Sequence, residues 1–321
     1  MNILLTGGLG YIGSHIAKLL GHNAIIIDNK VNSSLNYKKY LPNSIVYEND
    51  LNIRSLNKIF NQHEIKGVIH LAGLKAVNES LKDPLKYYRV NVGSSMDLME
   101  SMEKFRINNL IFSSSATVYG NKQKSPLKEE MELEAVNTYG STKIIIEQLI
   151  RDFSNKNPTF KAISLRYFNP LGADNIAGLS EKPLGKPLNL MPILLKAVKE
   201  KKKFKIFGKN YKTKDGTCIR DYIHVKDIAN AHLIAFKKLK EIKGYHAINL
   251  GLGKGVSVLE IIKIFESVNN VKVPFFFTSR RAGDSAESFA DNRKARNLLG
   301  WKPIYSYQDM VFDAWQASLK K

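Results

Sequence analysis

Apolar and polar positions follow two different rhythms along the first half of the chain. Short apolar runs rich in β-branched residues alternate with longer stretches in which apolar residues have helical spacing. The short runs, which predict strands, are Ile3–Leu5, Ala24–Ile27, Val46, Gly67–Leu71, Asn109–Ser113 and Lys161–Leu165. The longer stretches, which predict helices, are His15–Leu20, Leu51–Gln62, Val92–Phe105 and Ser141–Asn155. This alternation predicts an α/β fold, a Rossmann-type doubly wound parallel sheet.

The pattern changes after Asn169, where a stretch rich in glycine and proline begins. The periodic segments that follow it are shorter and lie at 192–201, 205–207, 225–239 and 246–250. We therefore predict two domains. A Rossmann domain covers 1–168, with the segment at about 222–252 returning to it, and a smaller C-terminal α+β substrate lobe covers 169–321.

A glycine-rich segment, Thr6–Gly13, stands between the first predicted strand and the first predicted helix. Glycines there let the backbone turn tightly and approach a pyrophosphate, which the N–H groups at the helix start can bind. A glycine pattern alone also fits an ordinary turn, but this position favours a dinucleotide. The residues expected to line the cofactor are Gly7, Gly10, Tyr11, Ile12 and Gly13.

Asp28 ends the second predicted strand, where an acid accepts hydrogen bonds from the adenosine ribose hydroxyls. Its charge would repel a 2′-phosphate, no arginine follows it, and Lys30 offsets that repulsion only in part. We therefore predict NAD and not NADP. The alternative is a surface aspartate in a turn. Further adenosine-side contacts are expected at Asn29, Asp50 and Leu51.

Tyr139 and Lys143 stand four residues apart at the start of a predicted helix, which places both side chains on one face. A neighbouring ammonium and a cationic nicotinamide both favour phenolate, so the tyrosine can take a proton from a sugar hydroxyl. Ser115, or Thr117 beside it, would orient the substrate oxygen. This spacing alone fits an ordinary helix pair, but the glycine turn and the run Ser113–Gly120 favour catalysis.

Seven stretches of the sequence resemble the motifs of one protein family. They are Thr6–His15, His70–Val77, Phe112–Gly120, Tyr139–Lys143, Leu165–Pro170, Arg220–Val225 and Arg280–Asp284. Through them the chain resembles, over nearly its whole length, the UDP-glucose/UDP-galactose 4-epimerases of the extended short-chain dehydrogenase/reductase superfamily. The resemblance implies a tightly held NAD that takes the C4 hydride and a 4-keto sugar nucleotide that turns over. The hydride then returns to the other face, with no net oxidation.

The resemblance also implies roles for individual residues. Tyr139 would be base and then acid, Lys143 would hold the nicotinamide ribose, and Ser115 would assist at O4. Further cofactor contacts are implied at Ala72, Gly73, Lys75, Asn91 and Tyr167, with Lys75 also counted toward the substrate. Contacts to the UDP-sugar are implied at Asn169, Asn189, Leu190, Phe207, Arg220, Arg281 and Asp284. Arginines suit a diphosphate because they are permanently charged bidentate donors, although surface ion pairs are the alternative.

Ser288 falls where the epimerases specific for plain hexoses carry a bulky tyrosine beside the C2 substituent of the sugar. The serine predicts that UDP-GlcNAc and UDP-GalNAc are accepted as well, unless neighbouring residues refill the space. The chain departs from the family on the adenosine side, where Lys18–Asn23 and Asn32–Asn43 are shorter. The family generally forms homodimers, and Val92–Phe105 with Ser141–Asn155 are the segments expected at that contact.

The bulk composition excludes some classes of protein and leaves others open. The formal charge is +20, from 49 Lys and Arg against 29 Asp and Glu, but the lysines are scattered and lack interleaved aromatics. We therefore expect a solvated lysine surface and no nucleic-acid partner, with steering of anionic substrates as the alternative. One cysteine, Cys218, excludes a disulfide framework and favours a cytoplasmic location. No signal peptide or membrane-spanning run is expected.

Two rival functions share the predicted fold. A sugar-nucleotide 4,6-dehydratase resembles its relatives in having a Thr-Asp-Glu run where this chain has Ser115-Ala116-Thr117. Without that carboxylate nothing obvious protonates a departing C6 hydroxyl. A non-catalytic NAD-sensing Rossmann protein is the second rival, but such a sensor has no need of Ser115, Tyr139 and Lys143 together. Both rivals are therefore less favoured than the epimerase.

Overall fold

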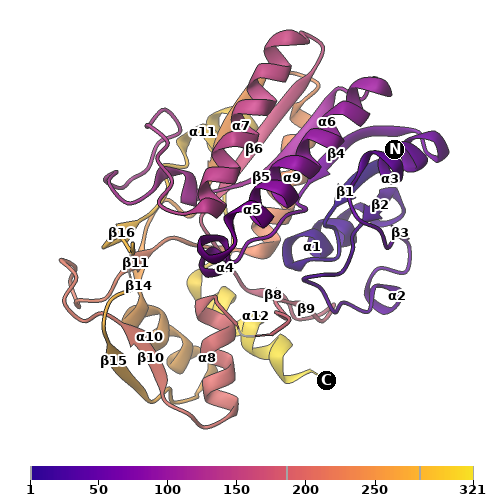
Figure 1. The fold of residues 1–321 in the computed structure, drawn as a ribbon. Coiled ribbons are helices and arrows are strands. Elements are labelled where there is room, and N and C mark those ends of the chain that lie inside the picture. The colour runs from indigo at the N-terminus through magenta and orange to yellow at the C-terminus, as the bar shows by residue number, and fades with distance from the viewer. Residues whose placement is uncertain (1, 186, 282, 321) are drawn as a thin grey trace. The chain divides into compact units, whose positions relative to one another are not determined.

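The protein is described from a computed structural model that covers residues 2–185, 187–281 and 283–320 (Figure 1). Ala282, which belongs to the matched stretch Arg280–Asp284, lies outside the described residues. The chain divides into two compact units. Unit 1 comprises Met1–Gly120, Glu132–Arg166 and Ala229–Ile248. Unit 2 comprises Asn121–Met131, Tyr167–Ile228 and Asn249–Lys321.

A seven-stranded sheet forms the centre of unit 1, with the strand order β13-β6-β5-β4-β1-β2-β3. The strands are β1 (Asn2–Thr6), β2 (Ala24–Ile27), β3 (Ile45–Tyr47), β4 (Ile65–His70), β5 (Asn109–Ser115), β6 (Lys161–Tyr167) and β13 (Tyr245–Leu250). β1 pairs in parallel with β2 and β4, so Leu5 lies between Ile26 and Ile69. The order is that of a doubly wound Rossmann sheet. The predicted fold class is therefore confirmed.

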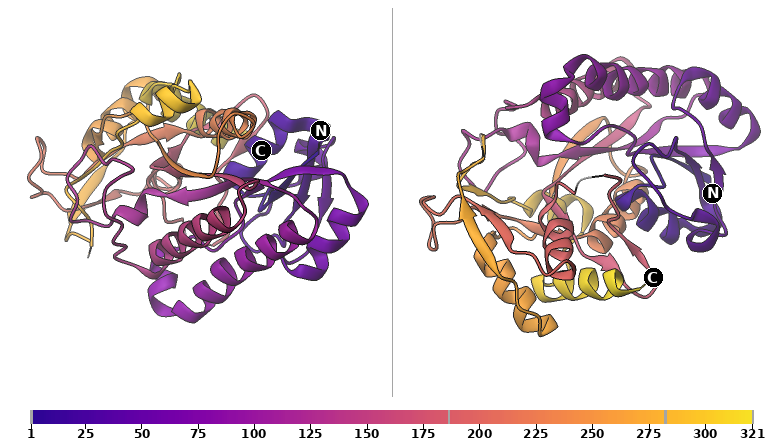
Figure 2. Two further views of the ribbon diagram at one scale, coloured as in Figure 1. Left: turned by 90° about the horizontal axis from the view of Figure 1, so that it is seen from above. Right: turned by 60° about the horizontal axis from the view of Figure 1, so that its bottom comes forward.

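Helices cover the sheet because its strands are apolar on both faces. The helices of this part of the chain are α1 (Tyr11–Leu20), α2 (Tyr37–Tyr40), α3 (Ile53–Gln62), α4 (Val77–Lys82), α5 (Pro84–Tyr87), α6 (Ser94–Lys104), α7 (Thr138–Lys156) and α9 (Val225–Lys238). Short turns of 3₁₀ or π helix are η1 (Gly21–Asn23), η2 (Tyr88–Gly93) and η3 (Ala116–Tyr119). Two views show α7 alongside α6 (Figures 1 and 2), and α7 also contacts η2.

Alternate residues of the strands face opposite layers of helices. On one face Leu4, Val68 and Phe112 pack with apolar residues of α3, α6 and α7, such as Leu56 and Met99. Their sequence neighbours point to the other face and are equally buried, among them Leu5, Ile26, Ile69 and Ile111. Strands buried on both faces read as continuous apolar runs, which is why the sequence revealed them.

The described residues of unit 2 form short strands and several helices besides the start of α9. The strands are β7 (Asn169–Leu171), β8 (Ala173–Asp174), β9 (Leu179–Ser180), β10 (Phe204–Phe207), β11 (Ile219–Arg220), β12 (Tyr222–His224), β14 (Val256–Ser257), β15 (Phe275–Thr278) and β16 (Glu287–Ser288). The helices are α8 (Leu190–Lys199), α10 (Val258–Asn269), α11 (Arg293–Leu299) and α12 (Tyr307–Leu319). Capping boxes at Ser257 and Ser306 begin α10 and α12. The three longer helices, α8, α10 and α12, enclose an apolar core that includes Leu194, Phe265 and Met310.

The segment Asn121–Met131 clusters with unit 2, although it precedes 168 in the chain. The reason is backbone pairing: Leu127 N donates to Phe289 O at 2.9 Å, and Asp291 N donates to Leu127 O at 2.8 Å. Side chains add to this, since Asn249 Nδ2 donates to Leu127 O at 2.9 Å. These partners are far from Leu127 in the sequence, so no local sequence pattern predicts the pairing.

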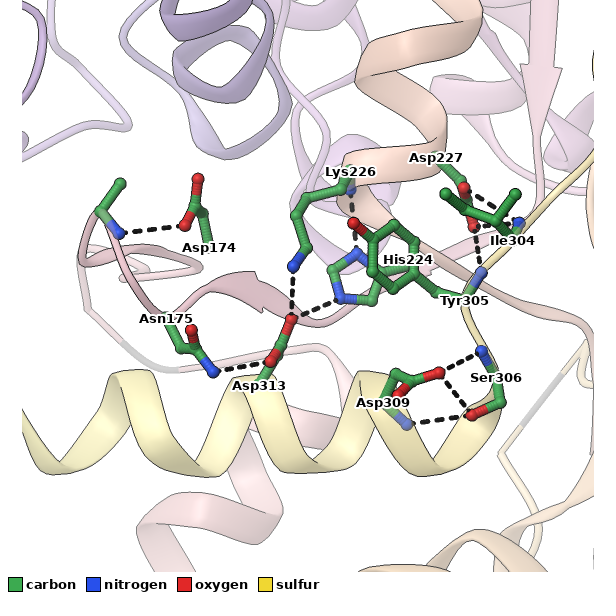
Figure 3. A network of polar contacts seen from close by, with 11 residues as sticks. Asp174, Asn175, His224, Lys226, Asp227, Ile304, Tyr305, Ser306, Asp309 and Asp313 are labelled. Atoms are coloured by element: carbon green, nitrogen blue, oxygen red, sulfur yellow. Dashed lines mark hydrogen bonds and ion pairs between the residues drawn. The ribbon is translucent and has the colours of Figure 1, made fainter.

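A buried network around Asp313 fixes α12 within unit 2 (Figure 3). The carboxylate accepts from Asn175 at 2.7 Å, from His224 at 3.2 Å and from Lys226 at 2.7 Å. The backbone N–H of Lys226 donates to His224 Nδ1 at 3.0 Å, so Nε2 carries the proton that bonds Asp313. The Tyr305 ring lies over the imidazole, 4.3 Å between centroids. Both imidazole nitrogens are occupied, which makes this histidine a structural one.

Within the described ranges, none of the helices has both the length and the apolarity needed to cross a lipid bilayer.

Candidate functional site

The glycine turn joins β1 to α1 in unit 1, and its glycines are required for different reasons. Gly7 has φ +70°, and a Cβ there would lie 2.7 Å from Ala72 N. A Cβ at Gly13 would lie 2.4 Å from Gly7 O and 2.7 Å from Gly8 Cα, so only glycine lets α1 approach the turn. Gly10 differs, because a Cβ there would meet only Gly7 O, at 3.3 Å. Packing within the chain therefore leaves space at Gly10 for a ligand.

The start of α1 is suited to a phosphate. Tyr11, Ile12 and Gly13 form its first turn, where backbone N–H groups have no acceptor within the helix. No acidic side chain occupies that turn, so nothing there opposes an anion. The residues present thus fit the pyrophosphate of a dinucleotide such as NAD.

Asp28 lies at the end of β2 and holds the glycine turn. Its carboxylate accepts from Leu9 N at 2.9 Å and from Lys30 N at 2.7 Å. Burial raises the pKa of Asp28, and these backbone bonds act against the rise. The Lys30 ammonium is paired with Glu48 at 3.4 Å, which leaves little positive charge beside Asp28 for a 2′-phosphate. Asn29 donates to Asp50 at 2.8 Å on the exposed side, next to half-buried Leu51.

The loop after β4 holds Ala72, Gly73 and exposed Lys75. The side-chain amide of Asn91 fixes the backbone of this loop. It accepts from Leu74 N at 2.7 Å and donates to Leu74 O at 3.0 Å. A third bond joins it to Thr142 Oγ1 at 3.1 Å. The buried amide is therefore occupied by protein groups, and its predicted contact with the cofactor stays a prediction.

His70 is a part of this site that the sequence reasoning missed. It is buried, with Nδ1 2.6 Å from Thr6 Oγ1 and Nε2 2.9 Å from Ser95 Oγ. Ser95 gives its one proton to Asn91 O at 2.7 Å, so Nε2 of His70 must be the donor to Ser95. Burial lowers the pKa of His70 to about 3, and Lys143 adds to this. The imidazole is neutral and links β4 to β1 and α6.

Ser115, Tyr139 and Lys143 come together at the end of β5 and the start of α7. Asn137 caps α7 by accepting from Gly140 N at 2.8 Å, which sets Tyr139 and Lys143 in the first two turns. The Tyr139 phenol is hydrogen-bonded to Ser115, and the Lys143 ammonium lies 5.8 Å from the centroid of the Tyr139 ring. Lys143 is 4% exposed and donates to Ser113 O at 2.7 Å.

The expectation that Lys143 favours the phenolate form of Tyr139 holds only in part at this cluster. Burial raises the pKa of Tyr139 to about 12, and the hydrogen bond with Ser115 acts against this. Burial also lowers the pKa of Lys143 to about 8, while Glu147 acts in the opposite direction. The Lys143 ammonium alone thus does not produce the phenolate, because desolvation of the anion outweighs it. Thr117 Oγ1 is buried and, among the described atoms, has no hydrogen-bond partner.

Unit 2 contains a pocket of about 240 Å³ that gathers most of the predicted substrate residues. The predicted residues that line it are Asn169, Asn189, Leu190, Phe207, Arg220, Arg281 and Asp284. Two arginines share the pocket: Arg220 is 3.3 Å from Asp284, and the Arg281 guanidinium lies 4.0 Å from the centroid of the Phe207 ring. Two guanidinium groups beside an aromatic ring suit a nucleoside diphosphate.

Two other predicted residues also belong to unit 2. Ser288 pairs with Arg220 across β16 and β11, but it is not among the described residues that line the pocket. Tyr167 is buried at the end of β6. Cys218 lines the pocket, and burial raises the pKa of its thiol, which makes it a poor nucleophile.

Asp221 is a second residue that the sequence reasoning missed. Its fully buried carboxylate accepts from Leu252 N at 2.8 Å and from Gly253 N and Ala290 N at 3.1 Å. Its backbone accepts from Asn169 and donates to Ser288, so it anchors two predicted substrate residues. Burial raises the pKa of Asp221 to about 7.

Comparison with known proteins agrees with this geometry. Residues 3–251 match the family model described as "NAD dependent epimerase/dehydratase family". A UDP-glucose 4-epimerase of Bacillus subtilis (strain 168) is 45% identical over 326 residues, covering 98% of this chain and 96% of that protein. A structure of UDP-glucose-4-epimerase from Stenotrophomonas maltophila, with bound NAD and formylated UDP-arabinopyranose, superimposes with TM-score 0.96. It is 39% identical and covers 99% of this chain and 98% of that one.

A further similar structure is the UDP-Glc/GlcNAc 4-epimerase from Campylobacter jejuni. Its TM-score is 0.85, with 34% identity and coverage of 99% of both chains. The protein belongs to the NAD-dependent epimerase/dehydratase family. Within that family it is an NAD-dependent UDP-sugar epimerase, an isomerase, as the resemblance implied.

Proposed function

We propose that the protein interconverts UDP-glucose and UDP-galactose by inversion at C4 through a 4-keto intermediate. The observation that carries this proposal is the cluster of Ser115, Tyr139 and Lys143, in which a phenol, a hydroxyl and a buried ammonium stand together. NAD, when bound, supplies the acceptor for the hydrogen that leaves C4 and its donor on return. The protein supplies the proton transfer and the positioning.

Each side chain has a distinct task in this proposal. Tyr139 accepts the proton of the 4-hydroxyl as the ketone forms and returns it as the alcohol is restored. Ser115 orients the same oxygen, with the unpartnered Thr117 hydroxyl available beside it. Lys143 holds the nicotinamide ribose and places positive charge beside the phenol. Because the pKa of Tyr139 is raised to about 12 by burial, the charge of the nicotinamide is the second requirement for phenolate.

The cofactor and the sugar nucleotide are assigned to different units. We assign the pyrophosphate to Gly7–Gly13 and the adenosine ribose to Asp28, with Asn29, Asp50 and Leu51 near the adenine. The unit 2 pocket, with Arg220 and Arg281, is assigned to the UDP moiety.

We further propose that the N-acetylated pair UDP-GlcNAc and UDP-GalNAc is a substrate. Ser288 has a small side chain on β16, directly across from Arg220 of the pocket. The similar C. jejuni protein, named a UDP-Glc/GlcNAc 4-epimerase, supports such a range of substrates.

Product analysis tests both proposals together. Purified protein should convert UDP-galactose to UDP-glucose and UDP-GalNAc to UDP-GlcNAc, measured by chromatography of the two nucleotide sugars. The variant Ser288→Tyr should retain UDP-galactose turnover and lose about tenfold or more of its kcat/KM for UDP-GalNAc, since an overpacked site costs ~1–3 kcal/mol. Equal turnover of UDP-GalNAc by the two proteins would remove Ser288 from the explanation. No turnover of either pair would refute the epimerase itself.

We also propose a homodimer formed through α6 and α7. Apolar side chains are exposed on α6, on α7 and on the neighbouring helix α5, and exposed apolar residues that gather on one surface mark protein–protein contacts. The exposed fractions are 72% for Leu85, 55% for Met96 and 41% for Ile145. These helices contact one another through η2 and α5, so the apolar side chains belong to one helical layer.

The variant Met96→Glu tests the dimer. It should shift the protein from twice the mass of one chain to a single chain, measured by light scattering during gel filtration, because a charge would be buried without a partner. Ile304→Glu serves as the control, since Ile304 is also exposed, at 69%, but lies in unit 2. A monomeric wild-type protein would refute the proposal, as would a Met96→Glu variant that remains dimeric.

A further inference from the structure

Two buried ions outside the predicted site lie within unit 1, one helical turn beyond Lys143. The Arg166 guanidinium of β6 binds the Glu147 carboxylate of α7 in a bidentate manner, with Nε to Oε1 at 2.9 Å and Nη2 to Oε2 at 2.6 Å. Both side chains are 1% exposed. Replacing such a pair by apolar residues is often neutral or stabilising. Stability of the fold therefore does not by itself explain this pair.

The remaining bonds of the pair lead to the catalytic segment. Ser114 donates to Glu147 Oε1 at 2.5 Å, and Tyr245 donates to Oε2 at 3.0 Å. Arg166 Nη1 donates to the Tyr119 hydroxyl at 2.9 Å. Ser114 immediately precedes Ser115, and Tyr119 ends the short helix η3 that follows Ser115. The pair thus holds both ends of the segment that carries the Ser115 and Thr117 hydroxyls.

The same carboxylate acts on Lys143. Glu147 follows Lys143 by four residues and Tyr139 by eight, so all three share one face of α7. The titratable groups that act on or face the Lys143 ammonium are Tyr139 and Glu147 of α7 and the neutral His70 of β4. The titratable groups that contact Glu147 are Arg166 of β6 and Tyr245 of β13. Tyr119 of η3 contacts Arg166 and not Glu147. Among these groups, Glu147 carries the negative charge.

We propose that Glu147, held by Arg166, is a positioning residue for this reaction: it fixes the Ser115 segment and keeps the buried Lys143 ammonium protonated. The inference rests on the proposed function, because it assigns Glu147 to the same proton transfer. Ser113 supports it, since its carbonyl accepts from Lys143 while the next residue donates to Glu147. One carboxylate therefore controls both the position and the charge of the neighbouring catalytic groups.

The variant Glu147→Gln tests this inference through the pH dependence of kcat with UDP-galactose. Loss of the carboxylate lowers the pKa of Lys143, so the alkaline limb of kcat should move to lower pH by about one unit. The KM for UDP-galactose should change less than about twofold, because the unit 2 pocket is not altered. Glu103→Gln is the matched control: Glu103 also pairs with a lysine of α7, Lys156 at 2.7 Å, but both are exposed. Its alkaline limb should match the wild type.

A double variant separates the charge of Glu147 from its part in folding. Glu147→Gln/Arg166→Met removes both buried ions, so thermal stability should recover relative to the single variant while the alkaline limb remains shifted. This variant also serves if Glu147→Gln fails to fold. The inference would be overturned if a folded, active Glu147→Gln protein kept the alkaline limb of kcat at the wild-type pH. It would also be overturned if the double variant returned that limb to the wild-type pH. Absence of turnover by the wild type would instead count against the proposed function.

Discussion

Replacing Tyr139 by phenylalanine should reduce kcat for UDP-galactose by about 10³-fold and leave the bound NAD in place, because general acid–base catalysis contributes effects of this size. Phenylalanine keeps the ring that lies 5.8 Å from the Lys143 ammonium, so the first turns of α7 should fold as before. What is lost is the oxygen that we propose exchanges the proton with the sugar. Product formation by chromatography and NAD released on denaturation measure the two quantities.

The matched control is Tyr87→Phe. Tyr87 is a fully buried tyrosine near Tyr139, and its hydroxyl shares its one proton between Ala76 O at 2.8 Å and Glu79 Oε2 at 3.0 Å. Its removal should lower stability by about 1 kcal/mol without a large change in kcat. If Tyr139→Phe retained more than about a tenth of the wild-type kcat, Tyr139 would not be the proton carrier.

The central sheet could be predicted from the sequence because its strands are apolar on both faces. Ala24–Ile27 and Ala162–Tyr167 are uninterrupted buried runs, and each predicted strand is present within a few residues. Helix ends were less accessible to prediction. The stretch Val92–Phe105 has helical spacing, yet the structure shows a π turn at Tyr88–Gly93 before α6. Periodicity identifies a helix but does not locate where its hydrogen bonding changes.

Most of unit 2 could not be predicted in the same way. β11, β14 and β16 have two residues each, too few for any periodicity, and they exist because Ile219 and Arg220 pair with residues such as Ser257 and Ser288. The substrate residues predicted near them came only from the resemblance to a family. Long-range pairing, which the local sequence does not encode visibly, builds that pocket.

The proposed catalytic residues could be predicted from the sequence, whereas the residues that hold them in place could not. Tyr139 and Lys143 have a recognisable spacing with a chemical meaning. Glu147 continues that spacing, but a glutamate four residues after a lysine on a helix normally indicates a solvated ion pair. Only the structure shows that it is buried against Arg166, whose position on β6 has no sequence relation to α7. Asp221 was missed for the same reason, since its partners are backbone N–H groups of distant loops.

Gly13→Ala should abolish retention of NAD, because the new methyl group meets backbone that cannot move aside. A Cβ at this position would lie 2.4 Å from Gly7 O, 2.7 Å from Gly8 Cα and 2.9 Å from Gly8 C. To relieve these contacts, α1 must move away from the turn, which carries its first N–H groups away from the pyrophosphate. Overpacking of ~3 kcal/mol corresponds to about a 100-fold loss of affinity. NAD content after purification and turnover with added NAD measure the effect.

The control lies at the other end of the same helix. Gly21 has φ +57°, and a Cβ there would meet no atom within 4 Å, so Gly21→Ala introduces backbone strain without a clash. It should lower stability by about 1 kcal/mol and keep the full amount of NAD. The contrast assigns the loss to the contact between α1 and the glycine turn, and not to glycine content in general. A Gly13→Ala protein that purified with wild-type NAD content would show that the turn can open without losing its phosphate site, contrary to the role assigned to Gly13.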